Sequence, residues 1–155
     1  MFCGGFFMVT YVISQLVVYN HTISEPIGWY LKLPVGTPTK DKLYLITIPS
    51  HNLNILKKLG YHDSSNTILK KLIATSGDTV EIKTTGLFVN GHLVSDSKLD
   101  SIVRGVNLEP LPIGYIHQLK TGEYFFMGAS KHSYDSRYFG VLGREYIVSM
   151  VAFIF

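Results

Sequence analysis

The first twenty residues of the chain contain no charged side chain, and this feature constrains the fold more than any other. The apolar run from Phe6 to Tyr19 approaches the roughly 20 residues that a helix needs to cross the hydrocarbon core of a bilayer. A cleavable signal peptide would carry a basic leader and a small-residue cleavage site, and a buried core helix would be shorter or show a polar face. We therefore expect a membrane anchor helix over residues 1–19 and a single domain over residues 20–155.

Charge around the anchor gives little information on its orientation. The first basic residue is Lys32, on the C-terminal side. Read literally, the positive-inside rule would keep the domain in the cytoplasm. The bias is only one or two charges, and long domains translocate largely regardless of charge.

Composition excludes several classes of protein. Charged residues make up 16% of the chain and hydrophobic residues 46%, which argues against disorder. The Lys and Arg residues are scattered, so no nucleic-acid partner is expected. The single cysteine, Cys3, excludes an intramolecular disulfide and a zinc site built on several thiolates. The histidines are too dispersed for a metal cluster, and we expect no metal or cofactor.

Short apolar runs separated by turn residues predict an antiparallel, mainly β domain after Asn20. The dipeptide Asn90-Gly91 between two apolar runs predicts a hairpin, because a type I′ turn needs positive φ at both central residues. The stretch Asp96–Gly122 has mixed polarity and two prolines, and we expect loops there. The predicted strands are residues 43–48, 67–75, 79–82, 87–89, 92–94, 124–127 and 146–155.

One short helix is predicted between Ser50 and Gly60. Leu53, Leu56 and Leu59 recur at helical spacing, Ser50 can cap the first turn, and Gly60 suits the left-handed position after the last one.

Ser24 lies in the first of three patterns that could carry chemistry. The segment Asn20–Tyr30 follows the predicted anchor directly, and Pro26 restricts the backbone two residues after the serine. A serine in such a loop can be held exposed as a nucleophile, but serines of this kind also serve simply as turn formers.

A pair of lysines, Lys70 and Lys71, forms the second pattern inside an apolar strand. Neighbouring strand residues point to opposite faces, so one lysine should face inward and the other solvent. Burial disfavours the ammonium form of a lysine, and a neutral amine is what a general base needs. The alternative is a pair of edge-strand lysines that prevent further strand pairing.

The third pattern is the polar segment Gly128–Gly140. Asp135 and Arg137 lie two residues apart, so on a strand they would share a face and could form an ion pair.

In this order and spacing, the three patterns resemble the S26 signal peptidase family, and in particular its conjugative-transfer branch of TraF-like pilin-processing peptidases. Asn20–Tyr30 matches the pattern Asn-x-Thr-x-Ser-x-Pro-x-Gly-x-Tyr of that branch. Lys70 stands eight residues before the aspartate of a Gly-Asp turn, Asp78, and Ser133–Gly140 reproduces Ser-x-Asp-Ser-Arg-Tyr-Phe-Gly. The resemblance covers nearly the whole chain and implies a signal-peptidase-like antiparallel β domain.

The resemblance also implies the catalytic roles. Ser24 would attack the scissile carbonyl and form an acyl-enzyme, with Lys70 as its general base. The backbone N–H of Ser24 and the hydroxyl of Thr22 would bind the oxyanion.

Three further residues would support the site. Ser133 would orient the amine of Lys70, while Asp135 and Arg137 would brace the surrounding chain. Two departures from the wider family are Ser76-Gly77-Asp78 in place of Pro-Gly-Asp, and Gly128-Ala129-Ser130 in place of the Gly-Asp-Asn of housekeeping enzymes.

The resemblance implies a single-pass protein of the bacterial inner membrane with its catalytic domain on the periplasmic face. A nucleophile just beyond the anchor would lie near the bilayer, where Trp29 and Tyr30 suit the interface. The expected substrate is a membrane-inserted, pilin-like precursor, cleaved and possibly cyclised by the substrate's own amino end. The alternatives are a housekeeping signal peptidase of broad range, a catalytically idle part of a transfer apparatus, and a cytoplasmic self-cleaving repressor of the Ser-Lys type.

Overall fold

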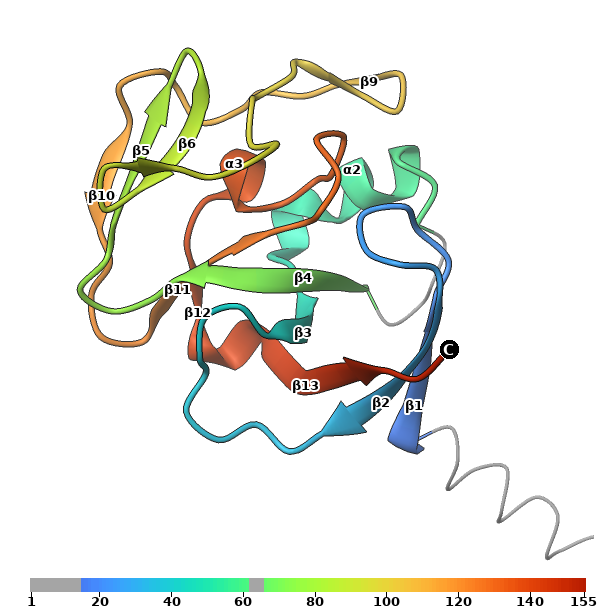
Figure 1. Ribbon diagram of the computed structural model, residues 1–155. Coiled ribbons are helices and arrows are strands. Elements are labelled where there is room, and N and C mark those ends of the chain that lie inside the picture. The colour runs from blue at the N-terminus through green and yellow to red at the C-terminus, as the bar shows by residue number, and fades with distance from the viewer. Residues whose placement is uncertain (1–14, 62–65) are drawn as a thin grey trace, which may run out of the picture.

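The computed structural model describes residues 15–61 and 66–155, and its largest unit is a seven-stranded sheet (Figure 1). The strands follow the order β1-β2-β13-β3-β4-β11-β12, and every neighbouring pair is antiparallel. The expectation of a mainly β, antiparallel fold is confirmed. The strands are β1 (Val17–Asn20), β2 (Gly28–Leu33), β3 (Leu43–Thr47), β4 (Thr67–Ala74), β11 (Glu123–Met127), β12 (Leu142–Gly143) and β13 (Ile147–Phe153).

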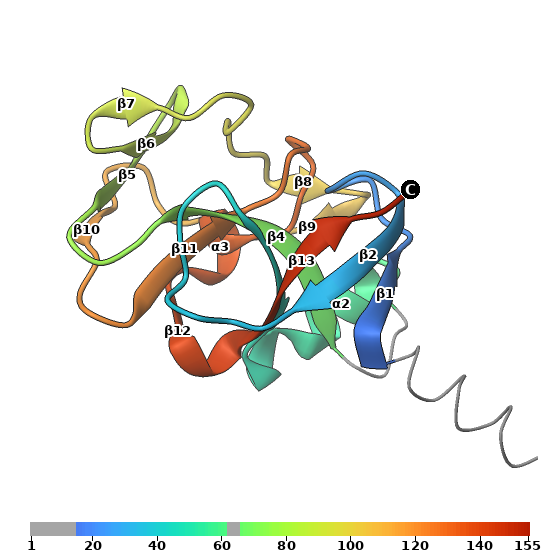
Figure 2. The same ribbon diagram turned by 60° about the horizontal axis from the view of Figure 1, so that its bottom comes forward.

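A smaller sheet of four strands, in the order β10-β5-β6-β7, lies at one end of the first (Figure 2). The predicted hairpin forms here, because Asn90 and Gly91 adopt φ of 51° and 79°. The expectation of loops over Asp96–Gly122 is wrong in part, since three short strands lie within it and one pairs with β5. The strands are β5 (Thr79–Lys83), β6 (Gly86–Val89), β7 (His92–Leu93), β8 (Ile102–Val103), β9 (Val106–Asn107) and β10 (Ile116–Gln118).

The predicted helix is present, although its capping differs from the expectation. Gly60 has φ of 82° and follows the helix as predicted. Ser50 is not the cap, because Pro49 occupies the position before the first turn and no side chain bonds the free N–H groups. The helical segments are η1 (Ser50–Asn52), α2 (Leu53–Lys58), α3 (Ser136–Phe139) and η2 (Arg144–Tyr146).

The main core packs α2 and the β8–β9 hairpin against the large sheet. Leu56 and Leu59, from the helical segment, lie in the same buried cluster as Val103 of β8. Ile46 and Phe126 contribute to this cluster from the large sheet. The long excursion after β7 therefore returns to the body of the domain and closes the core on that side.

The predicted anchor needs one correction at its C-terminal end. Val17–Asn20 forms β1 and pairs with β2, so an anchor helix does not extend to residue 19. The pairing with β2 gives the backbone N–H and C=O groups of this segment hydrogen-bond partners. In a helix, the same groups would bond to one another within the segment. Residues 1–14 of the predicted anchor lie outside the described residues. Among residues 15–61 and 66–155, no helix is long and apolar enough to span a membrane.

Candidate active site

Ser24 lies in the loop that joins β1 to β2, and the side chain of Asn20 holds this loop together. Its Nδ2 donates to the carbonyl oxygens of Thr22 and Glu25, both at 2.9 Å, and of Pro26 at 3.0 Å. Ala129 N donates to the carbonyl oxygen of Ser24 at 2.7 Å, which ties the loop to the chain after β11. The serine is 1% exposed. These contacts fix the backbone on both sides of the nucleophile candidate.

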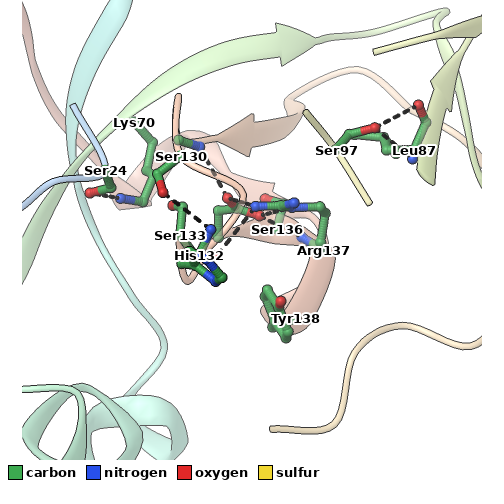
Figure 3. Close-up of polar contacts among 12 residues, drawn as sticks. Ser24, Lys70, Leu87, Ser97, Ser130, His132, Ser133, Ser136, Arg137 and Tyr138 are labelled. Carbon is green, nitrogen blue, oxygen red and sulfur yellow. Dashed lines mark hydrogen bonds and ion pairs between the residues drawn. The ribbon is translucent and has the colours of Figure 1, made fainter. Parts of the chain in front are cut away.

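Lys70 reaches this serine from the middle of β4. It is fully buried, and its Nζ donates to Ser24 Oγ at 2.9 Å (Figure 3). Lys71, on the other face of the strand, is only half-buried. The prediction that one lysine of the pair faces inward is confirmed, and the inward one contacts the hydroxyl that a base would have to deprotonate.

The hydroxyl of Thr22 continues the chain of hydrogen bonds away from Lys70. Thr22 Oγ1 lies 2.9 Å from Ser24 Oγ and donates to Asn20 Oδ1, also at 2.9 Å. A hydroxyl has one hydrogen, so Thr22 accepts from Ser24 in this arrangement. The predicted role of Thr22 as an oxyanion donor requires its hydrogen to leave Asn20 first.

Asp135 and Arg137 form a buried ion pair beside the site. Arg137 Nε and Nη2 each lie 2.8 Å from one oxygen of the Asp135 carboxylate, a two-pronged geometry, and neither side chain is exposed. The pair forms at a helix start and not on a strand, because Asp135 caps α3 and accepts from Arg137 N. Aspartate is a favoured N-cap, since its carboxylate satisfies an N–H group that the first helical turn leaves free.

This ion pair connects three segments of chain. Asp135 Oδ2 accepts from Gly128 N at 3.0 Å, and Arg137 donates to the carbonyl oxygens of Ser133 and Lys98, both at 3.3 Å. Burial lowers the pKa of Arg137, and the Asp135 carboxylate more than offsets this, so the pKa lies above its ordinary value. These contacts link Gly128, Ser133 and Lys98 through the ion pair, and its bracing role stays a prediction.

Ser133 does not make the predicted contact with Lys70. Its side chain is fully buried, but Oγ has no hydrogen-bond partner within the described part of the chain. Among those same residues, no three His, Cys, Asp or Glu side chains come together as a metal site would require.

Comparisons with known proteins show the family of the chain. Residues 2–155 match the family model described as "Signal peptidase, peptidase S26". The chain belongs to the S26 signal peptidase family. It is 30% identical over 143 residues to the plasmid transfer protein TraF of Escherichia coli, covering 85% of this chain and 78% of TraF. A solved structure, a signal peptidase I of Enterococcus faecalis, is 22% identical, with a TM-score of 0.44, covering 76% of this chain and 99% of the other.

Two residues near Ser24 were not predicted to belong to the site of this S26 peptidase. Glu25 is 5% exposed and its Oε1 accepts from Ala129 N at 3.2 Å. Burial raises the pKa of Glu25, and the positive charge of Lys70 opposes that shift. Tyr61 is the second, and it lines a small cavity together with Asn20 and Thr22. Asn20 belongs to the recognised motif, but only the structure reveals its contacts.

Gly128 offers a test of how tightly the site of this S26 peptidase is packed. A Cβ at this position would collide with Ser133 Oγ and lie 3.1 Å from the Ser24 carbonyl oxygen. We expect Gly128→Ala to displace the Ser24 loop, to reduce peptidase activity at least tenfold, and to lower the free energy of unfolding by about 1–3 kcal/mol, as overpacking does. Denaturant titration and activity of the purified variant check this. Gly36→Ala is the control, because nothing lies within 4 Å of the added methyl group.

Proposed function

We propose that this S26 peptidase is a membrane-anchored serine endopeptidase with Ser24 as nucleophile and Lys70 as general base. The 2.9 Å contact between the buried Lys70 Nζ and Ser24 Oγ is the observation that supports it best. Lys70 takes the proton of Ser24 as Oγ bonds to the scissile carbonyl carbon. The protonated lysine then gives that proton to the departing amine, and water or another amine releases the acyl group.

The proposed substrate is a membrane-inserted, pilin-like precursor. Exposed apolar side chains around the Ser24 loop support this, because they would place the serine at a lipid surface. Ile23 and Ile27 lie within the loop and are 60% and 52% exposed, and Trp29 and Phe155 lie directly beside it. Tyr30 is not part of this surface, contrary to expectation, since it is fully buried and its hydroxyl donates to Pro26 O.

We place the protein in the bacterial inner membrane, crossing it once, with the catalytic domain on the periplasmic face. The relative named a plasmid transfer protein supports a pilin precursor over a broad range of secreted proteins. An idle structural role is disfavoured because a buried lysine in contact with a serine is costly to maintain without a use.

Ser24→Ala is expected to abolish processing of a pilin-like precursor when the two proteins are co-expressed, because the acyl-enzyme can no longer form. The intact mass of the product checks this, and a product lighter than the linear one by one water would indicate cyclisation. The matched control is Ser130→Ala, on the neighbouring loop, whose hydroxyl contacts only the backbone of His132 within the described part of the chain. Processing that survives in Ser24→Ala would refute the proposed nucleophile. Equal processing of unrelated secretory precursors would favour a housekeeping role.

A further inference from the structure

Tyr61 stands directly after the helical segment and is held on two sides. Its backbone N–H donates to Leu56 O at 3.0 Å, and its ring packs in the main core. The guanidinium of Arg104, from the β8–β9 turn, lies 5.2 Å from the ring centroid and donates to Leu59 O at 3.3 Å. The side chain is therefore fixed, with 8% of the residue exposed.

The hydroxyl of Tyr61 is buried and has no hydrogen-bond partner among residues 15–61 and 66–155. A buried hydroxyl without a partner costs about 1–3 kcal/mol, and such groups are rare in folded proteins. A phenylalanine would fill the same space without this cost. The tyrosine therefore calls for an explanation outside the stability of the fold.

The surroundings of this hydroxyl belong to the Ser24 site. Burial raises the pKa of Tyr61, but while Lys70 is protonated its charge and that of Arg104 bring the pKa below its ordinary value. The nearby hydroxyls of Ser24 and Thr22 act in the same direction, although neither completes a hydrogen bond with the Tyr61 hydroxyl. Tyr61 also lines a cavity of about 20 Å³ together with Asn20 and Thr22. A cavity of this volume can hold about one water-sized group.

Counting hydrogens shows which hydroxyl is available as a donor. The hydrogen of Thr22 is given to Asn20 Oδ1, and that of Ser24 must pass to Lys70 when the serine attacks. The hydrogen of Tyr61 is committed to no acceptor in the described part of the chain. An oxyanion needs donors that are already in place and do not have to break another bond.

We propose that Tyr61 is a further catalytic residue, whose hydroxyl donates a hydrogen bond to the oxyanion formed when Ser24 attacks the substrate. This inference rests on the proposed peptidase function. As Oγ bonds to the carbonyl carbon, the C=O π electrons move to the carbonyl oxygen, and the neutral phenol together with Ser24 N–H binds that negative charge. The phenol keeps its proton throughout, and the bond weakens again when the carbonyl re-forms.

Tyr61→Phe removes only this hydroxyl and leaves the ring in place over Arg104. We expect kcat for a leader peptide, measured with the purified full-length protein in detergent, to fall about 10²-fold, as on loss of one oxyanion donor. KM should change little, because the bond forms in the transition state. The midpoint of denaturant unfolding should stay the same or rise, since the change removes an unpartnered buried hydroxyl.

The pH profile separates this role from a packing role. A phenol donates only while neutral, so wild-type activity should fall when rising pH deprotonates Tyr61. That alkaline limb should be missing in Tyr61→Phe. Tyr124→Phe is the control, since Tyr124 is also 8% exposed but lies on β11 within the core, and its kcat and pH profile should match those of wild type.

The outcomes distinguish this inference from the proposed function. If Ser24→Ala abolishes activity while Tyr61→Phe keeps wild-type kcat and the alkaline limb, the role of Tyr61 is refuted and the nucleophile stands. If Tyr61→Phe loses activity only in proportion to a loss of stability, the tyrosine is structural and the inference is refuted. If Ser24→Ala remains active, or wild type cleaves no precursor, both proposals are contradicted.

Discussion

Replacing Lys70 with methionine is expected to abolish peptidase activity, by about 10⁴-fold or more, while the protein stays folded. The change removes the only amine in contact with Ser24 Oγ among residues 15–61 and 66–155, so the serine keeps its proton during attack. Methionine is similar in length and apolar, which suits a position of zero exposure. Activity of the purified variant and its denaturant unfolding curve test the two halves of this prediction.

Two companion variants make the result specific to the amine of Lys70. Lys71→Met changes the neighbouring, half-buried lysine and should leave activity near wild type. Lys70→Arg keeps a positive charge but cannot act as a base, because a guanidinium does not lose its proton in proteins. Activity in Lys70→Arg close to wild type would contradict a general base and indicate that only the charge matters.

Arg137→Met is expected to lower the free energy of unfolding by about 3–5 kcal/mol. It leaves the Asp135 carboxylate buried without its cation, and breaking a buried ion pair on one side has that cost. The carbonyl oxygens of Ser133 and Lys98 also lose a donor. This is a large share of the 5–15 kcal/mol that typically stabilises a domain, so chemical denaturation should detect it at once.

An exposed ion pair provides the contrast. Lys83 Nζ lies 3.0 Å from Glu81 Oε2, and the two side chains are 45% and 29% exposed. Lys83→Met should lower the free energy of unfolding by less than about 1 kcal/mol. Arg137→Lys should lower the free energy of unfolding by an amount between those of Arg137→Met and Lys83→Met, since the charge remains but the bidentate contact is lost. A cost for Arg137→Met no larger than that for Lys83→Met would show that the pair does not brace the site.

The elements that follow from local sequence were the ones predicted correctly. Asn90-Gly91 defines its hairpin because few other dipeptides adopt positive φ at both positions without strain. The apolar run before Pro49 and the lysine pair within an apolar strand give β3 and β4 in the same way. In contrast, β10 has a mostly exposed, mixed-polarity sequence and exists only because β5 offers it hydrogen bonds, so no local pattern predicts it.

The N-terminal segment shows where composition alone misleads. Val17, Val18 and Tyr19 continue an apolar run, and by length they belonged to the predicted anchor. They form a strand because β2 lies alongside and forms backbone hydrogen bonds with them. An apolar side chain fits either element, and the available partner decides which of them forms.

For the site, the motifs in the sequence selected Ser24 and Lys70 as candidates, whose catalytic roles stay predictions. Strand alternation predicted correctly that one lysine of the pair turns inward. What the sequence could not give is the direction of each hydrogen bond. Only the folded chain shows that Thr22 donates to Asn20, that Ser133 Oγ has no partner within the described residues, and that Asp135 caps a helix. Only the tertiary structure shows that the ring of Tyr61 packs against Arg104 of the β8–β9 turn, because contacts between segments so far apart in the chain leave no periodic signal in either one.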